Sequence, residues 1–127
     1  MVRNAIFMLM LAVVSNSAMA AWSKITVNEE ATIYADLSTI SKSGNMIKMW
    51  DISDFKKKTA ANNYLSLKSQ REYDCKNKKN RLLTYSTFSG NMGNGSVVNS
   101  SSFARPWMPI YTGGIVSILW ITACGKH

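Results

Sequence analysis

The stretch YLSLKSQREYDCKNKKNRLLTYSTF, residues Tyr64–Phe88, decides the fold. It predicts two strands, Tyr64–Cys75 and Arg81–Phe88, joined by the basic turn Lys76–Asn80. Together the two strands form a β-hairpin that places Cys75 at its tip. The segments on either side extend this hairpin into a sheet.

Four more segments have the β-branched and aromatic residues that strands favour. Turn signals separate them, because glycine and asparagine accept positive φ angles at little cost. The turns and loops are Glu29-Glu30, Ser41–Asn45, Lys56–Asn63 and Gly90–Gly95, in which Asn94-Gly95 suits a primed hairpin turn. The four strands are Trp22–Asn28, Ala31–Leu37, Met46–Phe55 and Ser96–Phe103. We therefore expect one antiparallel sheet of about five or six strands.

The strand Met46–Phe55 alternates between two faces. Lys48 interrupts what would otherwise be a clean apolar face. That face holds Met46, Lys48, Trp50 and Ile52, and the other holds Ile47, Met49, Asp51 and Ser53.

The C-terminal block GIVSILWITAC, residues Gly114–Cys124, is ambiguous between helix and strand. Its isoleucines and valine favour a strand, yet Ile115, Leu119, Thr122 and Ala123 also form a helical stripe. The whole of Trp107–Gly125 contains no charged residue, which meets the loose length criterion for a membrane span. Because Pro109, Gly113 and Gly114 interrupt this run, we expect a buried core element and no transmembrane span. The preceding Arg105–Pro109 is predicted to be an extended connector.

The N-terminus has the order of a secretory signal peptide: Arg3, the apolar run Ala5–Val14, then small residues ending in Ala18-Met19-Ala20. We predict cleavage between Ala20 and Ala21, which divides the chain into a signal peptide, residues 1–20, and one domain, residues 21–127. A bacterial lipoprotein needs a cysteine at the position that Ala21 occupies. We therefore expect an exported protein without a lipid anchor, either periplasmic or secreted to the outer surface.

Export determines the expected state of the two cysteines, Cys75 and Cys124. In an oxidising compartment a lone pair of cysteines normally forms a disulfide. Reactive or metal-binding thiols are the alternative, but the single histidine, His127, is all that could add a ligand. We expect no metal and no cofactor.

Composition indicates a basic protein. The chain has 15 basic and 7 acidic residues, a formal net charge of +8, and removal of Arg3 with the signal peptide leaves 14 basic residues. Two clusters could bind acidic polymers or the acidic stretches of proteins; the alternative is that they are solvated loops that keep the sheet soluble. The first cluster is Lys56, Lys57 and Lys58, and the second is Lys76, Lys78, Lys79 and Arg81. Nucleic acid is not expected, because no set of stacking aromatics interleaves with the lysines.

Several motifs, in order, resemble the surface-adhesin protein E family of Gram-negative bacteria, and the resemblance spans nearly the whole of residues 21–127. The motifs are Tyr34-Ala35-Asp36, Met49-Trp50, Glu72-Tyr73-Asp74-Cys75, Arg81, the run Met92–Val98, Pro106-Trp107, and Trp120 followed by Cys124.

The resemblance implies an α+β fold: a single antiparallel sheet with a C-terminal helix held across one face by a disulfide between Cys75 and Cys124. It also implies binding of host extracellular-matrix or serum proteins, and members of the family can form dimers. The best-known members are lipid-anchored, whereas this chain has Ala21 where the acylated cysteine would stand. That difference favours an alternative, a periplasmic structural or envelope-maintenance protein that contacts peptidoglycan, lipopolysaccharide or a membrane-protein partner.

An enzyme is not expected. Glu72 and Asp74 would share a strand face, but no apolar cleft is evident to raise the pKa of either, and basic neighbours suggest salt bridges. The chain has 4 tryptophans, which we interpret mainly as core residues. Trp107, in the connector between two prolines, is the one expected to be partly exposed.

Overall fold

The structure is a computed structural model that describes residues 21–125. The predicted signal peptide, including Ala20, and the terminal His127 lie outside the described residues. The described elements in chain order are β1 (Trp22–Val27), β2 (Ala31–Ser43), β3 (Met46–Phe55), β4 (Ser66–Asp74), β5 (Lys79–Phe88), the short 3₁₀ turn η2 (Asn91–Gly93), β6 (Val97–Ser101), β7 (Met108–Pro109) and the helix α2 (Ile115–Cys124).

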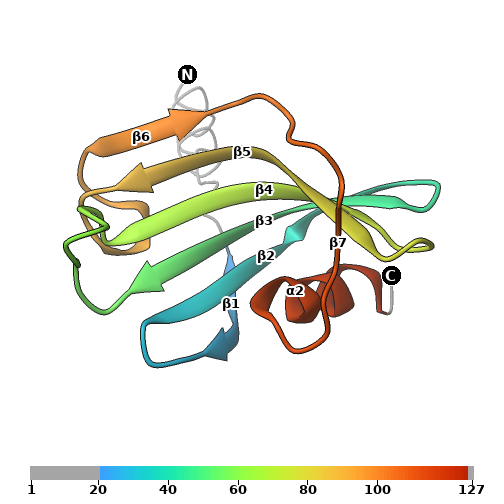
Figure 1. Cartoon of the computed structure of the whole chain (residues 1–127), viewed down its shortest axis with the longest axis horizontal. Helices are drawn as coiled ribbons and strands as arrows, with labels where there is room; N and C mark the ends of the chain where they lie inside the picture. Colours follow the sequence, from blue (N-terminus) through green and yellow to red (C-terminus); the bar gives the residue numbers. More distant parts are fainter. Residues whose placement is uncertain (1–20, 126–127) are drawn as a thin grey trace, which may run out of the picture.

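The strands form one antiparallel sheet in the order β1-β2-β3-β4-β5-β6, so every strand on this path lies beside its neighbours in sequence (Figure 1). The short β7 pairs with the start of β5, where Lys79 opposes Pro109 and Asn80 opposes Met108. The predicted hairpin is β4 and β5, with Asp74 opposite Lys79 and Ser66 opposite Phe88. The prediction of an antiparallel sheet is confirmed.

Several predicted boundaries move. β2 continues to Ser43, so its turn with β3 is only Gly44-Asn45 rather than Ser41–Asn45. The hairpin turn is Cys75–Lys78 and β5 begins at Lys79 rather than Arg81. The prediction of a primed turn at Asn94-Gly95 is wrong: Asn94 has an extended backbone, with φ −91°, whereas both primed turn types need positive φ at the first central residue.

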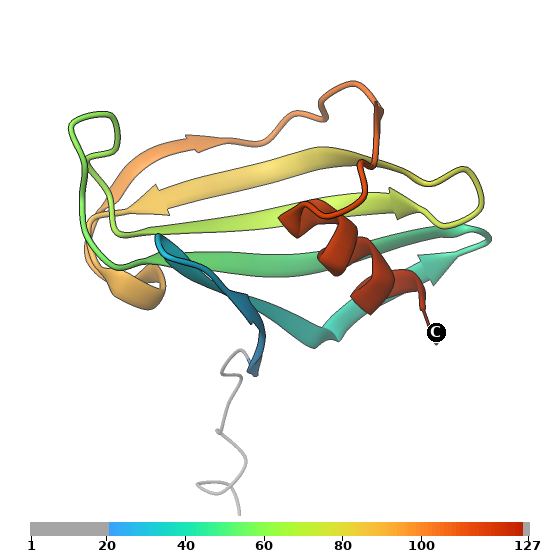
Figure 2. The same cartoon turned by 60° about the horizontal axis from the view of Figure 1, so that its bottom comes forward.

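One face of the sheet is covered by α2, which lies across the strands as Figure 2 shows. The buried face of β3 carries Ile47 and Met49, which are 1% and 0% exposed. The core therefore forms on the side opposite Lys48. Residues from β2, β4 and α2 complete it: Ile33, Ala35, Tyr73, Leu119 and Ala123.

The block that was ambiguous in sequence is a helix. Val116, Leu119, Trp120 and Ala123 face the core at the i, i+3, i+4, i+7 spacing of one helical side. Ile115, which the sequence suggested as part of the stripe, is instead 36% exposed. Packing against the apolar face of the sheet thus overrides the strand preference of the isoleucines.

Candidate binding surface

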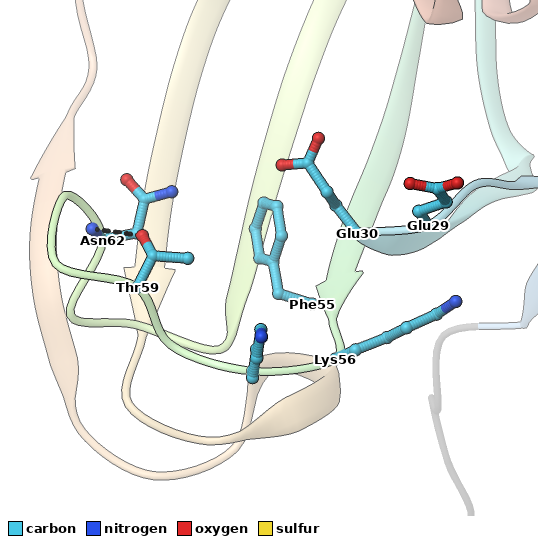
Figure 3. Close-up of a pocket in the computed structure, with 7 residues that line it drawn as sticks. Glu29, Glu30, Phe55, Lys56, Thr59 and Asn62 are labelled. Atoms are coloured by element: carbon cyan, nitrogen blue, oxygen red, sulfur yellow. Dashed lines mark hydrogen bonds between the residues drawn. The ribbon is translucent and has the colours of Figure 1, made fainter.

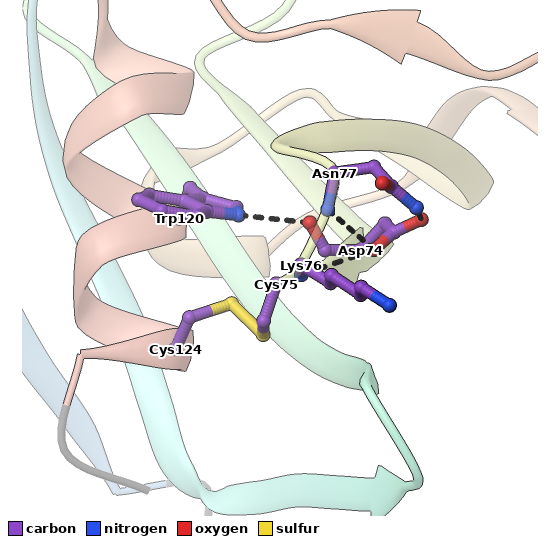
Figure 4. The surroundings of a disulfide bond; sticks show 6 residues. All are labelled: Asp74, Cys75, Lys76, Asn77, Trp120 and Cys124. Atoms are coloured by element: carbon purple, nitrogen blue, oxygen red, sulfur yellow. Dashed lines mark hydrogen bonds between the residues drawn. A yellow bond between two sulfur atoms is a disulfide. The ribbon is translucent and has the colours of Figure 1, made fainter.

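Three contacts fix the tip of the β4–β5 hairpin to the helix α2 and to the β2–β3 turn. Cys75 forms a disulfide with Cys124 at the end of α2, so the predicted pairing is confirmed. One turn earlier in the helix, the indole N–H of Trp120 donates to the carbonyl oxygen of Asp74 at 3.2 Å (Figure 4). The backbone N–H of Cys75 donates to the Asn45 carbonyl of the β2–β3 turn at 3.0 Å. The tip is therefore a rigid platform rather than a free loop.

Asp74 shapes the turn itself. One carboxylate oxygen accepts from the backbone N–H groups of Lys76 and Asn77, at 3.1 and 2.9 Å, and the other accepts from the Asn77 side-chain amide at 3.0 Å. These bonds, the one from the Asn77 backbone first, lower the pKa of Asp74. Asp74 is 6% exposed and its carboxylate caps the turn; the charge of Lys79, which lies opposite it in the β4–β5 ladder, also lowers the pKa of Asp74.

Three of the four predicted basic residues of the hairpin face solvent: Lys76, Lys78 and Lys79 are exposed. Lys78 has its ammonium 5.6 Å from the ring centre of Trp120, and its carbonyl accepts from Ile110 N–H at 3.2 Å. These three lysines are called the hairpin lysines below.

Arg81 differs from the hairpin lysines, because its charge is already paired. Its Nε donates to Glu72 Oε1 at 2.9 Å and its Nη2 lies 2.8 Å from the same oxygen. Its guanidinium also lies 4.6 Å from the ring centre of Trp107, which is half-buried. Arg81 thus joins β4, β5 and the connector, and Trp107 packs on a cation.

The first predicted cluster, Lys56–Lys58, lies at the opposite end of the sheet. It follows β3, whereas the hairpin lysines follow β4, and the nine residues of β4 separate the two ends by about 30 Å. Lys56 and Lys57 border a hollow of about 300 Å³ that Glu29 and Glu30 also border (Figure 3). The two clusters do not form one patch, and this one is offset by acidic neighbours.

The open face of the sheet holds a group that sequence reasoning did not single out. The ammonium of Lys68 lies between two indoles, 6.0 Å from the ring centre of Trp22 and 5.2 Å from that of Trp50. The alternation of β3 already placed Trp50 and Lys48 together, but the contact with β1 requires the strand register. These half-buried rings hold a lysine on the face that α2 leaves uncovered.

A buried polar group lies on the helix-covered face. Arg71 Nε is 3.4 Å from Asp51 Oδ2, an ion pair without good hydrogen-bond geometry. Burial raises the pKa of Asp51 to about 6, and the Arg71 charge opposes that rise. The hydroxyl of Tyr73 is buried beside them with no hydrogen-bond partner among residues 21–125. Burial, and then the Asp51 charge, raises the pKa of Tyr73.

The carboxylates tested as a catalytic pair have separate structural partners. Glu72 binds Arg81 and Asp74 closes the turn. Among residues 21–125, no three histidine, cysteine or acidic side chains are grouped to hold a metal ion. In the same part of the chain, no helix has the length and hydropathy needed to cross a membrane.

A family model described as surface-adhesin protein E matches residues 22–125. No curated protein matches the chain. Among solved structures, crystal form II of Haemophilus influenzae protein E superposes with a TM-score of 0.66 at 9% identity, over 87% of this chain and 91% of that one. The selenomethionine form gives 0.65 at 8% identity over the same shares. Protein E from non-typeable Haemophilus influenzae gives 0.63 at 9%, over 87% and 80%.

At such low identities the likeness to these structures shows a shared fold. The family model adds a match in sequence that covers every described strand and the helix. The chain belongs to the surface-adhesin protein E family.

Proposed function

We propose that this protein is an exported, non-enzymatic binding protein of the adhesin type, and that its hairpin lysines bind acidic stretches of host matrix or serum proteins. Membership of the family supports the adhesin-like part. The rest depends on one observation: Glu72 and Asp74, the acidic residues nearest the hairpin lysines, are 8% and 6% exposed, and their carboxylates are bonded to Arg81 and to the turn backbone. The positive charge of Lys76 and Lys78 is therefore left for a partner, while Asp74 partly offsets the charge of Lys79.

The rigidity of the tip supports the same proposal. Binding costs free energy when it orders mobile segments, and this turn is already held by a disulfide, the Trp120 bond and the Asp74 bonds. Only the lysine side chains would lose freedom on binding. Arg81 is a positioning residue in this proposal, since its guanidinium is committed to Glu72.

The test compares two triple variants that each remove three positive charges. Lys76→Ala/Lys78→Ala/Lys79→Ala should weaken binding to heparin and to an acidic matrix protein by roughly tenfold or more, and abolish its salt sensitivity. Lys56→Ala/Lys57→Ala/Lys58→Ala is the matched control and should retain most binding. Both variants should melt near wild type, because all six side chains are exposed. Equal losses in the two variants would mean that only net charge matters and would refute the hairpin site.

We also propose that residues 1–20 are a cleaved signal peptide and that the mature domain begins at Ala21. The backbone nitrogen of Ala21 donates to Asp36 Oδ2 at 3.2 Å, and Asp36 is 4% exposed. Cleavage after Ala20 converts this nitrogen to an α-ammonium group, so the same contact becomes an ion pair. The intact mass of protein taken from the periplasm and the medium tests the proposal. A mass that includes residues 1–20 refutes it.

A second candidate, a periplasmic structural or envelope-maintenance protein, is favoured by one specific residue. Ala21 stands where a lipid-anchored protein has cysteine, so nothing in this motif would tether the domain to the cell surface. Its partner would be lipopolysaccharide, peptidoglycan or a membrane protein. Protection of the protein from external protease in intact cells, with release by osmotic shock, would favour this candidate. Cleavage in intact cells would favour the adhesin.

A further inference from the structure

The helix α2 is apolar on both sides. Its inward side packs on the sheet, and no residue of Ile115–Cys124 is charged. The outward side carries Ile115, Ile118 and Ile121, of which Ile121 is 57% exposed and Ile115 is 36% exposed. A helix at the surface of a domain normally turns a polar face to water. Packing in the core therefore does not explain why these outward positions carry isoleucine.

The segment before the helix extends this apolar surface. Met108 and Tyr111 are 54% and 72% exposed, and both border an apolar hollow of about 410 Å³ against Ile115. We name Met108, Tyr111, Ile115, Ile118 and Ile121 the outer helix surface. Other exposed apolar residues, such as Val27 and Val97, belong to β1 and β6 and are not part of it.

The backbone of the hairpin turn borders the outer helix surface, and Lys78 is the hairpin lysine whose side chain reaches the helix. Lys79 pairs with Pro109 in the β5–β7 ladder, and the Lys78 carbonyl binds the Ile110 N–H. Lys78 also lies over Trp120 of the helix. The nearby carboxylates, Glu72 and Asp74, are buried and bonded to Arg81 and to the turn backbone. The result is an apolar surface with a positive rim.

We propose that the outer helix surface docks on a phospholipid bilayer with anionic headgroups. Its isoleucines, Met108 and Tyr111 would enter the boundary between headgroups and acyl chains, while the hairpin lysines bind headgroup phosphates. Surface-bound helices combine these same features, an apolar side with flanking lysines and an aromatic ring at the interface. Charge complementarity selects this occupant over a second copy of the chain. A second copy of the chain would bring the same excess of positive charge to this surface, whereas anionic headgroups bring the opposite charge.

This inference goes beyond the proposed function, and the experiment separates the two. The mature protein is sedimented with vesicles of equal parts phosphatidylglycerol and phosphatidylcholine, and with phosphatidylcholine alone. We expect binding to the anionic vesicles only. Ile121→Glu should weaken it roughly tenfold or more, since the exposed isoleucine no longer leaves water. Val97→Glu is the matched control: Val97 is 58% exposed, at the other end of the sheet, and the variant adds the same charge.

Each hairpin lysine contributes about fivefold to partition onto an anionic surface, so the triple alanine variant should bind roughly a hundredfold more weakly. Ile121→Glu should still bind heparin as wild type does, which distinguishes failure of this inference from failure of the proposed function. Three outcomes would overturn the inference: no vesicle binding, equal losses in Ile121→Glu and Val97→Glu, or a dimer in solution that Ile121→Glu dissolves while vesicle binding is absent. Binding to lipopolysaccharide micelles without binding to vesicles would also overturn it.

Discussion

Removal of the disulfide should cost this domain a large part of its stability. Cys75 and Cys124 are 49 residues apart, and releasing a loop of that length gives the unfolded chain about 14 cal/mol/K of entropy, or about 4 kcal/mol at 25 °C. Domains of this size have a free energy of unfolding of about 5–15 kcal/mol. We therefore expect Cys75→Ala/Cys124→Ala to lower the free energy of unfolding by about 4 kcal/mol, measured by urea denaturation followed by circular dichroism.

The structure also indicates where the loss should appear first. Without the disulfide, α2 is held by burial of Leu119 and Ala123 and by the Trp120 bond to Asp74. Hydrogen exchange should therefore accelerate in α2 more than in the central strands. Trp120→Phe is the control: it removes one hydrogen bond, worth about 1 kcal/mol, and keeps the disulfide. A loss below about 1 kcal/mol in the double variant, or uniform acceleration across helix and sheet, would refute this reasoning.

Two further predictions concern the buried group on the helix-covered face. Because the folded-state pKa of Asp51 is raised to about 6 from 3.8, the folded state holds this proton more tightly, and the group's contribution to stability falls as pH rises from about 4 to 6. Relative to Asp51→Asn, wild type should lose about 3 kcal/mol of unfolding free energy between pH 4 and pH 7; parallel pH profiles in chemical denaturation would contradict this. Tyr73→Phe should unfold at the wild-type temperature or above it, because the hydroxyl is buried without a partner among the described residues. A clear drop in the melting temperature would show that the hydroxyl is hydrogen-bonded after all.

The strands could be predicted from sequence, while the helix could not be predicted from its residues alone. β3, β4 and β5 show the composition and turns that local chemistry dictates. The segment Ile115–Cys124 has strand-favouring isoleucines, and its helical form depends on packing against the sheet and on the Cys124 tether. The resemblance to the surface-adhesin protein E family implied this helix, which the intrinsic propensities of its residues did not predict.

The core face of β3 shows a second limit. In a one-layer sheet both faces of a strand are partly apolar, and both faces of β3 include charged residues: Lys48 and Asp54 on one and Asp51 on the other. The face that α2 covers becomes the core face of β3. Asp51 is therefore buried and paired with Arg71, while Lys48 stays exposed. No local pattern in β3 encodes where a helix some 60 residues away will lie.

The Gly90–Gly95 turn shows a third limit. Its glycines correctly predict a turn, but the chain folds back over the sheet instead of reversing tightly. Gly93 N–H donates to Ser66 Oγ at 2.9 Å, and Met92 N–H donates to Asp54 at 2.8 Å. These contacts join residues 27 and 38 positions apart in sequence. Tertiary hydrogen bonds, rather than the local preference of Asn94-Gly95, therefore determine the conformation of this turn.

Charge is distributed unevenly between the two ends of the sheet, and the net charge does not reveal this difference. Of its 7 acidic residues, only Glu29 and Glu30 are exposed, and both lie at the end where Lys56 and Lys57 lie. The other five carboxylates are buried or half-buried and bind backbone amides, side-chain amides, the Ser38 hydroxyl or arginines. Folding therefore removes negative charge from the surface selectively. One end of the sheet is balanced, and the hairpin end is left positive beside the outward isoleucines, so a partner with negative charge and apolar contact area should approach that end.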